Sequence, residues 1–354
     1  MFVKKVEISI NNKKIEVPSD YTILKAATEN GIRIPTICHD ERLKPSGACR
    51  MCVVEVEGAR SLVTACSTPV RGGMVIKTDS DRVINSRKTT LELLWADHNY
   101  DCLTCEKAGN CVLQDLCYEY DIEPEARPYI QHLTNHVDSS NKFYTFNEDK
   151  CILCGKCVRV CAELEGVGAI SFSQRGHHTH ISHPFETGME LSDCTSCGSC
   201  VAVCPTGALM EKTNTKFRNW DIEKKVRTTC TYCGVGCQLE LVVKDNKVVR
   251  VDSPTDGLNK GITCVKGKFG YKFIDSGDRL TKPLIRKKGE LVESSWEEAY
   301  DLIVSKMKST IKNYGSDSLA ALSSARCTNE ENYLLQKLFR GVIKTNNVDH
   351  CARL

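Results

Sequence analysis

The arrangement of the cysteines constrains this chain more than any other feature of its sequence. Of its 354 residues 22 are cysteines, and nearly all of these fall into five tight groups. The groups are Cys38, Cys49, Cys52 and Cys66; Cys102, Cys105 and Cys111, with His98 just upstream; Cys151, Cys154, Cys157 and Cys161; Cys194, Cys197, Cys200 and Cys204; and Cys230, Cys233, Cys237 and Cys264. Cysteines at short fixed spacings are typical of metal-binding domains.

The rest of the sequence favours metal binding over disulfide bonds. The N-terminal segment MFVKKVEISINNKKIEV lacks the apolar core of a secretory signal, so we expect a cytoplasmic protein, in which thiols stay reduced. No apolar run is long enough to predict a membrane span. The 48 basic residues nearly balance the 45 acidic ones, which gives no reason to expect nucleic acid as a partner.

The two central groups share the spacing C-x2-C-x2-C-x3-C, which is typical of bacterial ferredoxins with two 4Fe–4S clusters. In that arrangement the fourth cysteine of each run binds the cluster of the other run. The spacing therefore predicts one cluster on Cys151, Cys154, Cys157 and Cys204, and a second on Cys194, Cys197, Cys200 and Cys161. Zinc also binds paired C-x2-C motifs, and a structural zinc protein is the alternative at this point.

Between these runs lies a histidine-rich stretch. It contains His177, His178, His180 and His183. We interpret the stretch as an exposed hairpin, with a second metal site as the alternative.

The N-terminal pattern predicts a small β-grasp module. Residues 3–17 predict two strands joined by an Asn-Asn turn, and a helix capped by Ser19 or Asp20 follows as far as Glu29. Further strands are expected over 52–56, 62–65 and 74–77. Residues 81–97 have helical periodicity, and the predicted helix ends at His98.

After about residue 285 the cysteines thin out and α/β patterning begins. Ser295 begins a predicted helix that ends at Tyr314, a buried strand is expected over 319–322, and a second helix runs from Thr328 to Arg340. A lone β–α unit cannot bury its apolar faces. We therefore expect this segment to be the incomplete start of a larger α/β domain.

The first two cysteine groups resemble a known family. The segment CHDERLKPSGACRMC, followed by His98-x3-Cys102-x2-Cys105-x5-Cys111, resembles the N-terminal part of the large iron–sulfur subunit of respiratory NADH dehydrogenase. The same pair of motifs opens iron-only hydrogenases and NAD(P)-linked formate dehydrogenases. The resemblance implies a 2Fe–2S cluster on the first group and a 4Fe–4S cluster with one histidine ligand, His98, on the second.

The later motifs separate these relatives. Cys230-x2-Cys233-x3-Cys237-x26-Cys264 resembles the 4Fe–4S domain that opens the molybdopterin oxidoreductases, in which Lys266 matches a lysine between this cluster and the pterin. The segments SSARCTNEENYLLQKLFR and NNVDHCARL resemble formate dehydrogenase catalytic subunits. In that family the CARL-type segment precedes the selenocysteine or cysteine that binds the metal, so the catalytic residue is expected just after Leu354.

The resemblance implies an α+β multi-domain iron–sulfur protein. We expect a β-grasp 2Fe–2S ferredoxin domain over 1–79, a 4Fe–4S domain with one histidine and three cysteine ligands over 80–120, a two-cluster ferredoxin domain over 140–215, a molybdopterin-oxidoreductase 4Fe–4S domain over 223–282 and the start of a pterin-binding α/β domain over 283–354. One 2Fe–2S and four 4Fe–4S clusters follow, with a molybdenum or tungsten bis-molybdopterin guanine dinucleotide in the full-length protein. Cys117, Cys327 and Cys351 are left outside the ligand sets and are expected to be small buried thiols.

The function that this resemblance implies is electron transfer in a formate dehydrogenase alpha subunit, which oxidises formate to CO2 or reduces CO2. Nicotinamide accepts only a hydride, so a one-electron chain needs a flavin to reach it. We therefore expect an FMN- and NAD(P)-binding flavoprotein subunit near Cys38–Cys66, with ferredoxin or a hydrogenase subunit as alternative partners. The alternative function is that of the large iron–sulfur subunit of NADH-quinone oxidoreductase.

Overall fold

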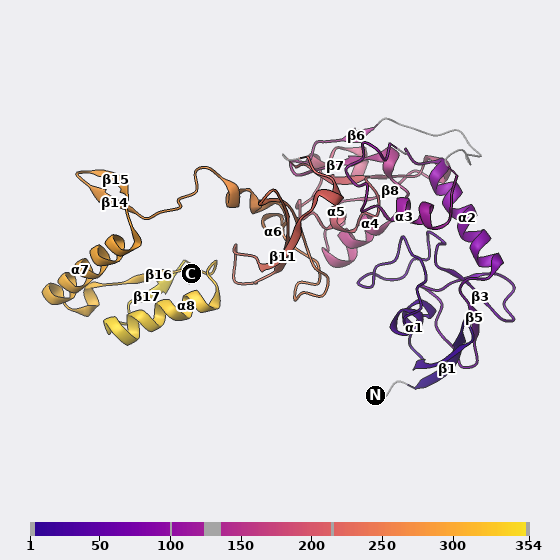
Figure 1. Cartoon of the computed structure of the whole chain (residues 1–354), viewed down its shortest axis with the longest axis horizontal. Helices are drawn as coiled ribbons and strands as arrows, with labels where there is room; N and C mark the ends of the chain where they lie inside the picture. The colour runs from indigo at the N-terminus through magenta and orange to yellow at the C-terminus, as the bar shows by residue number, and fades with distance from the viewer. Residues whose placement is uncertain (1–3, 100, 124–135, 214–215, 352–354) are drawn as a thin grey trace. The chain divides into compact units, whose positions relative to one another are not determined.

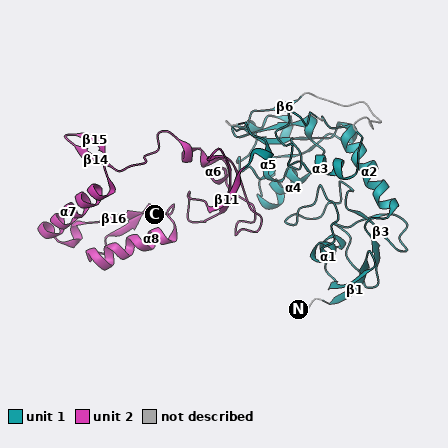
Figure 2. Ribbon diagram, viewed as in Figure 1, with its two compact units in different colours: residues 1–222 teal, residues 223–354 magenta. Residues whose placement is uncertain are grey.

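The computed structural model describes residues 4–99, 101–123, 136–213 and 216–351, which form two compact units. Unit 1 spans residues 1–222 and unit 2 spans residues 223–354 (Figure 2). Helices and strands are mixed along both units, which confirms the α+β class (Figure 1). No helix in the described part of the chain is long and apolar enough to cross a bilayer.

Unit 1 begins with a five-stranded sheet and one helix. Its elements are β1 (Lys5–Ile10), β2 (Lys13–Pro18), α1 (Ile23–Glu29), β3 (Val53–Val56), β4 (Val63–Thr64) and β5 (Val75–Lys77). The strand order is β2-β1-β5-β3-β4, with β1 and β5 parallel, and this confirms the predicted β-grasp arrangement. Asn11 and Asn12 both have positive φ, as a two-residue hairpin turn requires. Ile8, Ile23 and Ile76 are fully buried beneath the helix.

The predicted start of α1 was wrong by several residues. Thr22 caps the helix, because its hydroxyl oxygen accepts a hydrogen bond from Lys25 N at 3.2 Å. Ser19 lies too early in the chain to cap a helix that begins at Ile23, and its backbone N–H donates to Lys4 O at 2.9 Å, which extends the pairing beside β2. The residues between Ser19 and Thr22 form the turn that precedes the helix.

Two helices then lead to the second cysteine group. They are α2 (Asp81–Ala96), which Ser80 caps, and α3 (Val112–Glu119). Arg87 is buried in the middle of α2, and its guanidinium donates to Val53 O at 2.8 Å and to the Tyr120 hydroxyl at 3.1 Å. This single side chain therefore ties α2 both to the β-grasp sheet and to the segment after α3.

The remainder of unit 1 is built around the two ferredoxin-type runs. Its elements are β6 (Val137–Asp138), β7 (Tyr144–Asn147), α4 (Lys156–Arg159) with a wider turn over Val160–Leu164, β8 (Ser171–Ser173), β9 (His180–Ser182), α5 (Ser199–Val203) and β10 (Leu209–Glu211). The sheet order is β10-β7-β6, all antiparallel. β8 and β9 pair with each other, which confirms a hairpin in the histidine-rich stretch, and His177 and His178 are exposed in its turn.

Unit 2 contains a three-stranded sheet followed by an α/β segment. Its elements are β11 (Lys224–Thr229), β12 (Gln238–Lys244), β13 (Lys247–Asp252), α6 (Val265–Phe269), β14 (Leu284–Lys287), β15 (Glu290–Glu293), α7 (Trp296–Tyr314), β16 (Ala321–Ser323), α8 (Asn329–Gln336) and β17 (Val348–His350). β11, β12 and β13 form one antiparallel sheet, and β16 pairs in parallel with β17.

The α/β segment has the predicted order but leaves much apolar surface exposed. Ser295 caps α7 and no residue of that helix is buried, so Trp296 and Ile303 lie more than half exposed. The expectation of a buried strand over 319–322 was wrong in part, since β16 begins at Ala321 and Leu322 is 82% exposed. With only β17 beside it, β16 has no layer to cover its second face.

Candidate iron–sulfur centres

The first cysteine group gathers on the loop between α1 and β3 and on the turn after β4. Cys38, Cys52 and Cys66 are each 1% exposed. Cys38 N donates to Cys49 Sγ at 3.4 Å, and the Ser46 hydroxyl donates to Cys38 Sγ at 3.6 Å. The hydrogen bond from Cys49 lowers the pKa of Cys38 to about 4. The same contact and burial raise the pKa of Cys49, so the thiolate is favoured at Cys38 while Cys49 keeps its proton.

The second group lies on the loop before α3, with Cys111 as the residue that precedes the helix. Burial and the neighbouring Cys105 raise the pKa of both Cys102 and Cys111. His98 follows the end of α2, is buried, and lies with its ring 6.4 Å from that of Trp95. A residue from the segment before β11 fixes the cysteine loop, because Arg218 donates to Cys105 O at 2.8 Å.

Cys117 is a fourth thiol beside the second group. It lies on α3 and is 8% exposed. Burial raises its pKa to about 12, and the thiols of Cys111 and Cys102 contribute in the same direction. This confirms the expected buried thiol at Cys117. The expectation was wrong for Cys351, which is exposed, and Cys327 is only partly buried.

The third and fourth groups surround two separate cavities, and they do so in the crossed pattern that the ferredoxin spacing predicts. The first cavity is lined by Cys151, Cys154, Cys157 and Cys204. The second is lined by Cys161, Cys194, Cys197 and Cys200. Four thiols around one enclosed space match the donor set of a 4Fe–4S cubane.

A repeated loop conformation produces these two cavities. Leu153 and Ser196, which occupy the same position in the two runs, have φ of 50° and 54°. Gly155 and Gly198, two residues later, are both left-handed, with φ of 68° and 80°. This winding turns backbone N–H groups inward, and Ser196 N donates to Cys194 Sγ at 3.4 Å. Glycine relieves the strain that an L side chain has at such φ values, and at Gly155 a Cβ atom would also come within 3.0 Å of the Phe172 ring.

The fifth group lies in unit 2, at the edge of the β11–β12 sheet and at the start of α6. Cys230 N donates to Cys237 O at 2.8 Å, which closes the loop between the first three cysteines. Burial raises the pKa of Cys237, and so do the nearby thiols of Cys230, Cys233 and Cys264. Lys266 lies on α6 and is exposed.

The first and third groups are tied together by a clamp from α4. Arg159 donates through one guanidinium nitrogen to Lys44 O at 2.8 Å and through the other to Cys38 O. One turn later, Glu163 accepts from Lys44 N at 2.9 Å. Leu43 completes the contact by packing on Val160. The loop that carries Cys38 is therefore fixed to the helix that carries Cys157 and Cys161.

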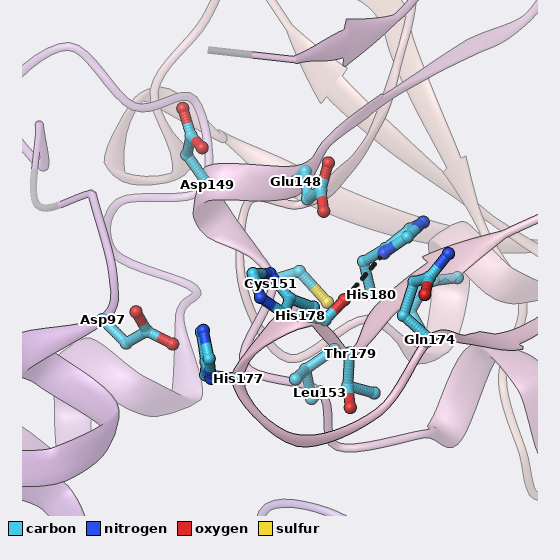
Figure 3. Close-up of a pocket in the computed structure, with 11 residues that line it drawn as sticks. Asp97, Glu148, Asp149, Cys151, Leu153, Gln174, His177, His178, Thr179 and His180 are labelled. Atoms are coloured by element: carbon cyan, nitrogen blue, oxygen red, sulfur yellow. Dashed lines mark hydrogen bonds between the residues drawn. The ribbon is translucent and has the colours of Figure 1, made fainter. Parts of the chain in front are cut away.

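A polar cavity of about 580 Å³ lies beside Cys151, under the histidine-rich hairpin. Figure 3 shows Asp97 and His177 on one side of it and Glu148 with Asp149 on another. His180 Nδ1 lies 3.0 Å from His178 O, which stabilises the hairpin turn. Among the described residues no three His, Cys, Asp or Glu side chains converge closely enough to hold a single metal ion, so the structure gives no support for a second metal site in the histidine-rich stretch.

Sequence reasoning missed the residues that support these groups. Tyr144 lies with its hydroxyl 3.1 Å from Cys194 Sγ, and Arg159 and Arg218 bind the loops of the first and second groups. Tyr144 and Arg218 lie outside the cysteine motifs, and Arg159 is one of the variable residues between Cys157 and Cys161. Their partners are 50 to 121 residues away in the chain, so no local spacing could have indicated them.

Comparison with protein families matches the whole series of modules. The matches are a 2Fe-2S iron-sulfur cluster binding domain over 3–81, the NADH-ubiquinone oxidoreductase-G iron-sulfur binding region over 87–125, a 4Fe-4S dicluster domain over 150–208, a molybdopterin oxidoreductase Fe4S4 domain over 223–276 and a molybdopterin oxidoreductase domain over 279–354. The chain belongs to the molybdopterin oxidoreductase family. These matches favour iron–sulfur clusters over zinc.

Similar proteins of this family carry several different names. The chain is 38% identical to the second G-type component of NADH-quinone oxidoreductase of Rhizobium meliloti and to the alpha subunit of NADPH-Fe(3+) oxidoreductase of Geobacter sulfurreducens, over 98% and 99% of its length. It is 36% identical, over its full length, to a Bacillus subtilis protein provisionally named a formate dehydrogenase. The chain spans 40% of the length of each of these relatives.

A solved structure supports the likeness for part of the chain. A chain of the NAD+-reducing [NiFe]-hydrogenase in its H2-reduced state is 30% identical, with a TM-score of 0.55. The match covers 60% of this chain and 89% of the hydrogenase chain.

Proposed function

We propose that this chain is the iron–sulfur electron-transfer part of a formate dehydrogenase alpha subunit. In the full-length protein it passes electrons between a molybdenum or tungsten bis-pterin site and a flavin, NAD(P) or ferredoxin partner. The chain spans 40% of the length of its relatives, so the activity proposed here is that of a longer protein of which this chain is a part. The observation that supports the electron-transfer part of this proposal is the crossed pair of four-cysteine cavities.

The residues fit one 2Fe–2S cluster and four 4Fe–4S clusters. Each bound cluster accepts and releases one electron at a time. The ligands would be Cys38, Cys49, Cys52 and Cys66; His98, Cys102, Cys105 and Cys111; Cys151, Cys154, Cys157 and Cys204; Cys161, Cys194, Cys197 and Cys200; and Cys230, Cys233, Cys237 and Cys264.

Within unit 1, the chain's own residues hold the first three cysteine groups against one another. Cys49, Cys111 and Cys154, which come from three different groups, all pack on one apolar core with Ile37 and Met51. The clamp of Arg159 fixes the loop of Cys38 to the same region. These contacts support a continuous electron path through unit 1, with water excluded between its modules.

Iron and sulfide analysis tests the cluster assignment. The anaerobically purified chain is expected to contain about eighteen iron and about eighteen sulfide per molecule, the content of one 2Fe–2S and four 4Fe–4S clusters. Stoichiometric zinc with no acid-labile sulfide would exclude it.

A second candidate is the large subunit of an NADH-quinone oxidoreductase, which the Rhizobium meliloti relative favours. The formate proposal rests on SSARCTNEENYLLQKLFR and NNVDHCARL and on the two complete ferredoxin-type runs. The native enzyme, purified from its source, separates the two. We expect formate to reduce its clusters, and we expect NADH to do so only through a flavoprotein. An enzyme whose clusters NADH reduces and formate never does would favour the quinone-linked candidate.

We also propose an FMN-bearing partner subunit near the Cys38–Cys66 module. The likeness to a chain of an NAD+-reducing hydrogenase supports it. A one-electron chain needs a flavin to reach nicotinamide. The native enzyme is expected to co-purify with FMN in a separate subunit. A preparation that reduces NAD(P) with formate and lacks such a subunit would contradict the expectation.

A further inference from the structure

Tyr144 reaches one of the two four-cysteine cavities from a strand outside the cysteine motifs. It is the first residue of β7, is 2% exposed, and lines the cavity of Cys161, Cys194, Cys197 and Cys200. Its hydroxyl oxygen lies 3.1 Å from Cys194 Sγ. The strand is held in place, because β7 pairs with β10 and Tyr144 lies opposite Glu211.

The direction of this hydrogen bond follows from the chemistry of a bound cluster. A cysteine that binds iron is a thiolate and has no proton to give, so Tyr144 donates and Cys194 accepts. Burial raises the pKa of the Tyr144 phenol, which therefore keeps its proton. Ser196 N is a second donor to the same sulfur.

We propose that Tyr144 raises the reduction potential of the centre on Cys161, Cys194, Cys197 and Cys200 by this hydrogen bond. The inference rests on the cluster assignment proposed above. When the centre accepts one electron from a neighbouring centre, the cluster and its four thiolates gain one negative charge and no bond breaks. Donors to the ligand sulfurs stabilise this added charge more than they stabilise the oxidised form.

The sister cavity has a different hydrogen-bonding environment. No tyrosine lines the cavity of Cys151, Cys154, Cys157 and Cys204 among the described residues. Thr206 is the hydroxyl residue there, and it donates to Lys150 O at 2.7 Å while lying 3.9 Å from Cys204 Sγ. The Thr206 hydroxyl proton therefore points to a backbone carbonyl and is not donated to the cysteine sulfur.

One acidic group opposes Tyr144 within the same cavity. Glu165 lines it and accepts a hydrogen bond from the Ser199 hydroxyl. Its negative charge disfavours reduction of a nearby cluster. Tyr144 and Glu165 are therefore expected to shift the reduction potential of the same centre in opposite directions, so variants of the two residues can be compared in one experiment.

The test is a redox titration, followed by EPR, of the anaerobically purified chain. In Tyr144→Phe one centre should become reducible only at lower potential, with iron and sulfide content unchanged. Glu165→Gln should shift the same centre upward. Tyr118→Phe is the matched control, because Tyr118 is 77% exposed, and it should leave every potential unchanged.

A second variant covers the case in which Tyr144→Phe does not fold. Replacement of Tyr144 by 3-fluorotyrosine keeps nearly the same shape with a stronger donor, and it should raise the potential of the same centre. Full iron content with unchanged potentials in either variant would overturn the role of Tyr144 and leave the proposed function standing. Wild-type protein without iron and sulfide would instead overturn the cluster assignment itself.

Discussion

At the scale of single residues, some side chains would bind the clusters and others would change the charge or the hydrogen bonding around them. Cysteine thiols supply the ligands, but a neutral group among them changes the charge of the centre. His98 is the case in point, since it lies buried at the end of α2, just before the second cysteine group. A neutral imidazole in place of a thiolate leaves one negative charge fewer, which favours the reduced state.

The first prediction concerns this histidine. His98→Cys should keep a 4Fe–4S cluster, because four thiolates satisfy the cubane, but its potential should fall as the ligand set gains a negative charge. EPR-monitored titration measures the shift, and iron analysis checks that the cluster is present. Cys117→Ala is the control and should change neither. Identical titration curves for His98→Cys and wild type would remove His98 from the ligand set.

A second residue-scale prediction concerns Asp252, the last residue of β13. Burial raises its pKa, but hydrogen bonds from Arg250 and the positive charges of Arg250, Lys268 and Lys225 outweigh this and hold the pKa at about 2. The folded pKa lies below the ordinary value of 3.8, so this stabilisation is complete well above that value and is lost as the pH falls towards 2.

Asp252→Asn should therefore lower the free energy of unfolding of unit 2 by about 1–2 kcal/mol at pH 7. The loss should be the same at every pH between about 5 and 8, because Asp252 stays ionised throughout that range. Urea unfolding measures it. Asp278→Asn, in an exposed turn, is the control with no expected effect. A loss that disappears by about pH 6 would contradict the assignment.

At the scale of elements, helix α4 with the turn that follows it does two tasks. It carries Cys157 and Cys161, and through Arg159 and Glu163 it grips the loop of the β-grasp module. Both tasks fall within two helical turns. The contact between two iron–sulfur modules is therefore made by the same segment that supplies proposed cluster ligands. We expect a displacement of the Cys38 loop to change the position of this segment.

Arg159→Ala should weaken this contact by about 1–3 kcal/mol, the value of two hydrogen bonds to backbone carbonyls. Amides over 38–47 should exchange hydrogen faster, while iron content stays unchanged. Arg159→Lys should have an intermediate effect, because an ammonium cannot match the guanidinium fork. Arg175→Ala, an exposed arginine on the histidine-rich hairpin, is the control. Unchanged exchange in Arg159→Ala would show that the packing of Leu43 alone holds the loop.

At the scale of the whole molecule, the chain divides its proposed clusters between two units. Four cysteine groups lie in unit 1 and the fifth lies in unit 2, where Lys266 follows Cys264 on α6. Lys266 is exposed and its neighbour Lys268 is buried, with its ammonium on Val251 O. Of these two lysines, Lys266 is therefore the one whose side chain is exposed.

We propose that Lys266 assists electron transfer between the fifth group's cluster and the pterin in the full-length enzyme. Lys266→Ala should slow the formate-dependent reduction of the clusters in stopped-flow measurements by tenfold or more, equivalent to at least about 1.4 kcal/mol in the barrier. Iron content should be unchanged. Lys288→Ala, in the exposed turn between β14 and β15, is the control. Wild-type rates in Lys266→Ala would exclude the role.

The sequence by itself predicted the five cysteine groups and the crossed pairing of the two central runs, which the lining of the two cavities matches. The cluster types predicted for the first two groups came from the family resemblance. Cluster ligation needs particular residue types at short spacings, and such spacings are visible along the chain. The β-grasp order and most helix bounds also followed from local signals. The cap of α1 did not, because Ser19, Asp20 and Thr22 are all favourable N-cap residue types and only the turn after β2 decides that the helix begins after Thr22.

Only the tertiary structure decided what surrounds each centre. Tyr144, Arg159 and Arg218 act on cysteines or carbonyls that are at least 50 residues away in sequence, and a single side chain leaves no periodic signal. Hydrogen bonds and charges near a sulfur depend on which strand or helix packs against it. The sequence therefore predicts the ligands of these centres, whereas the packing of β7, α4 and the segment before β11 defines their environment.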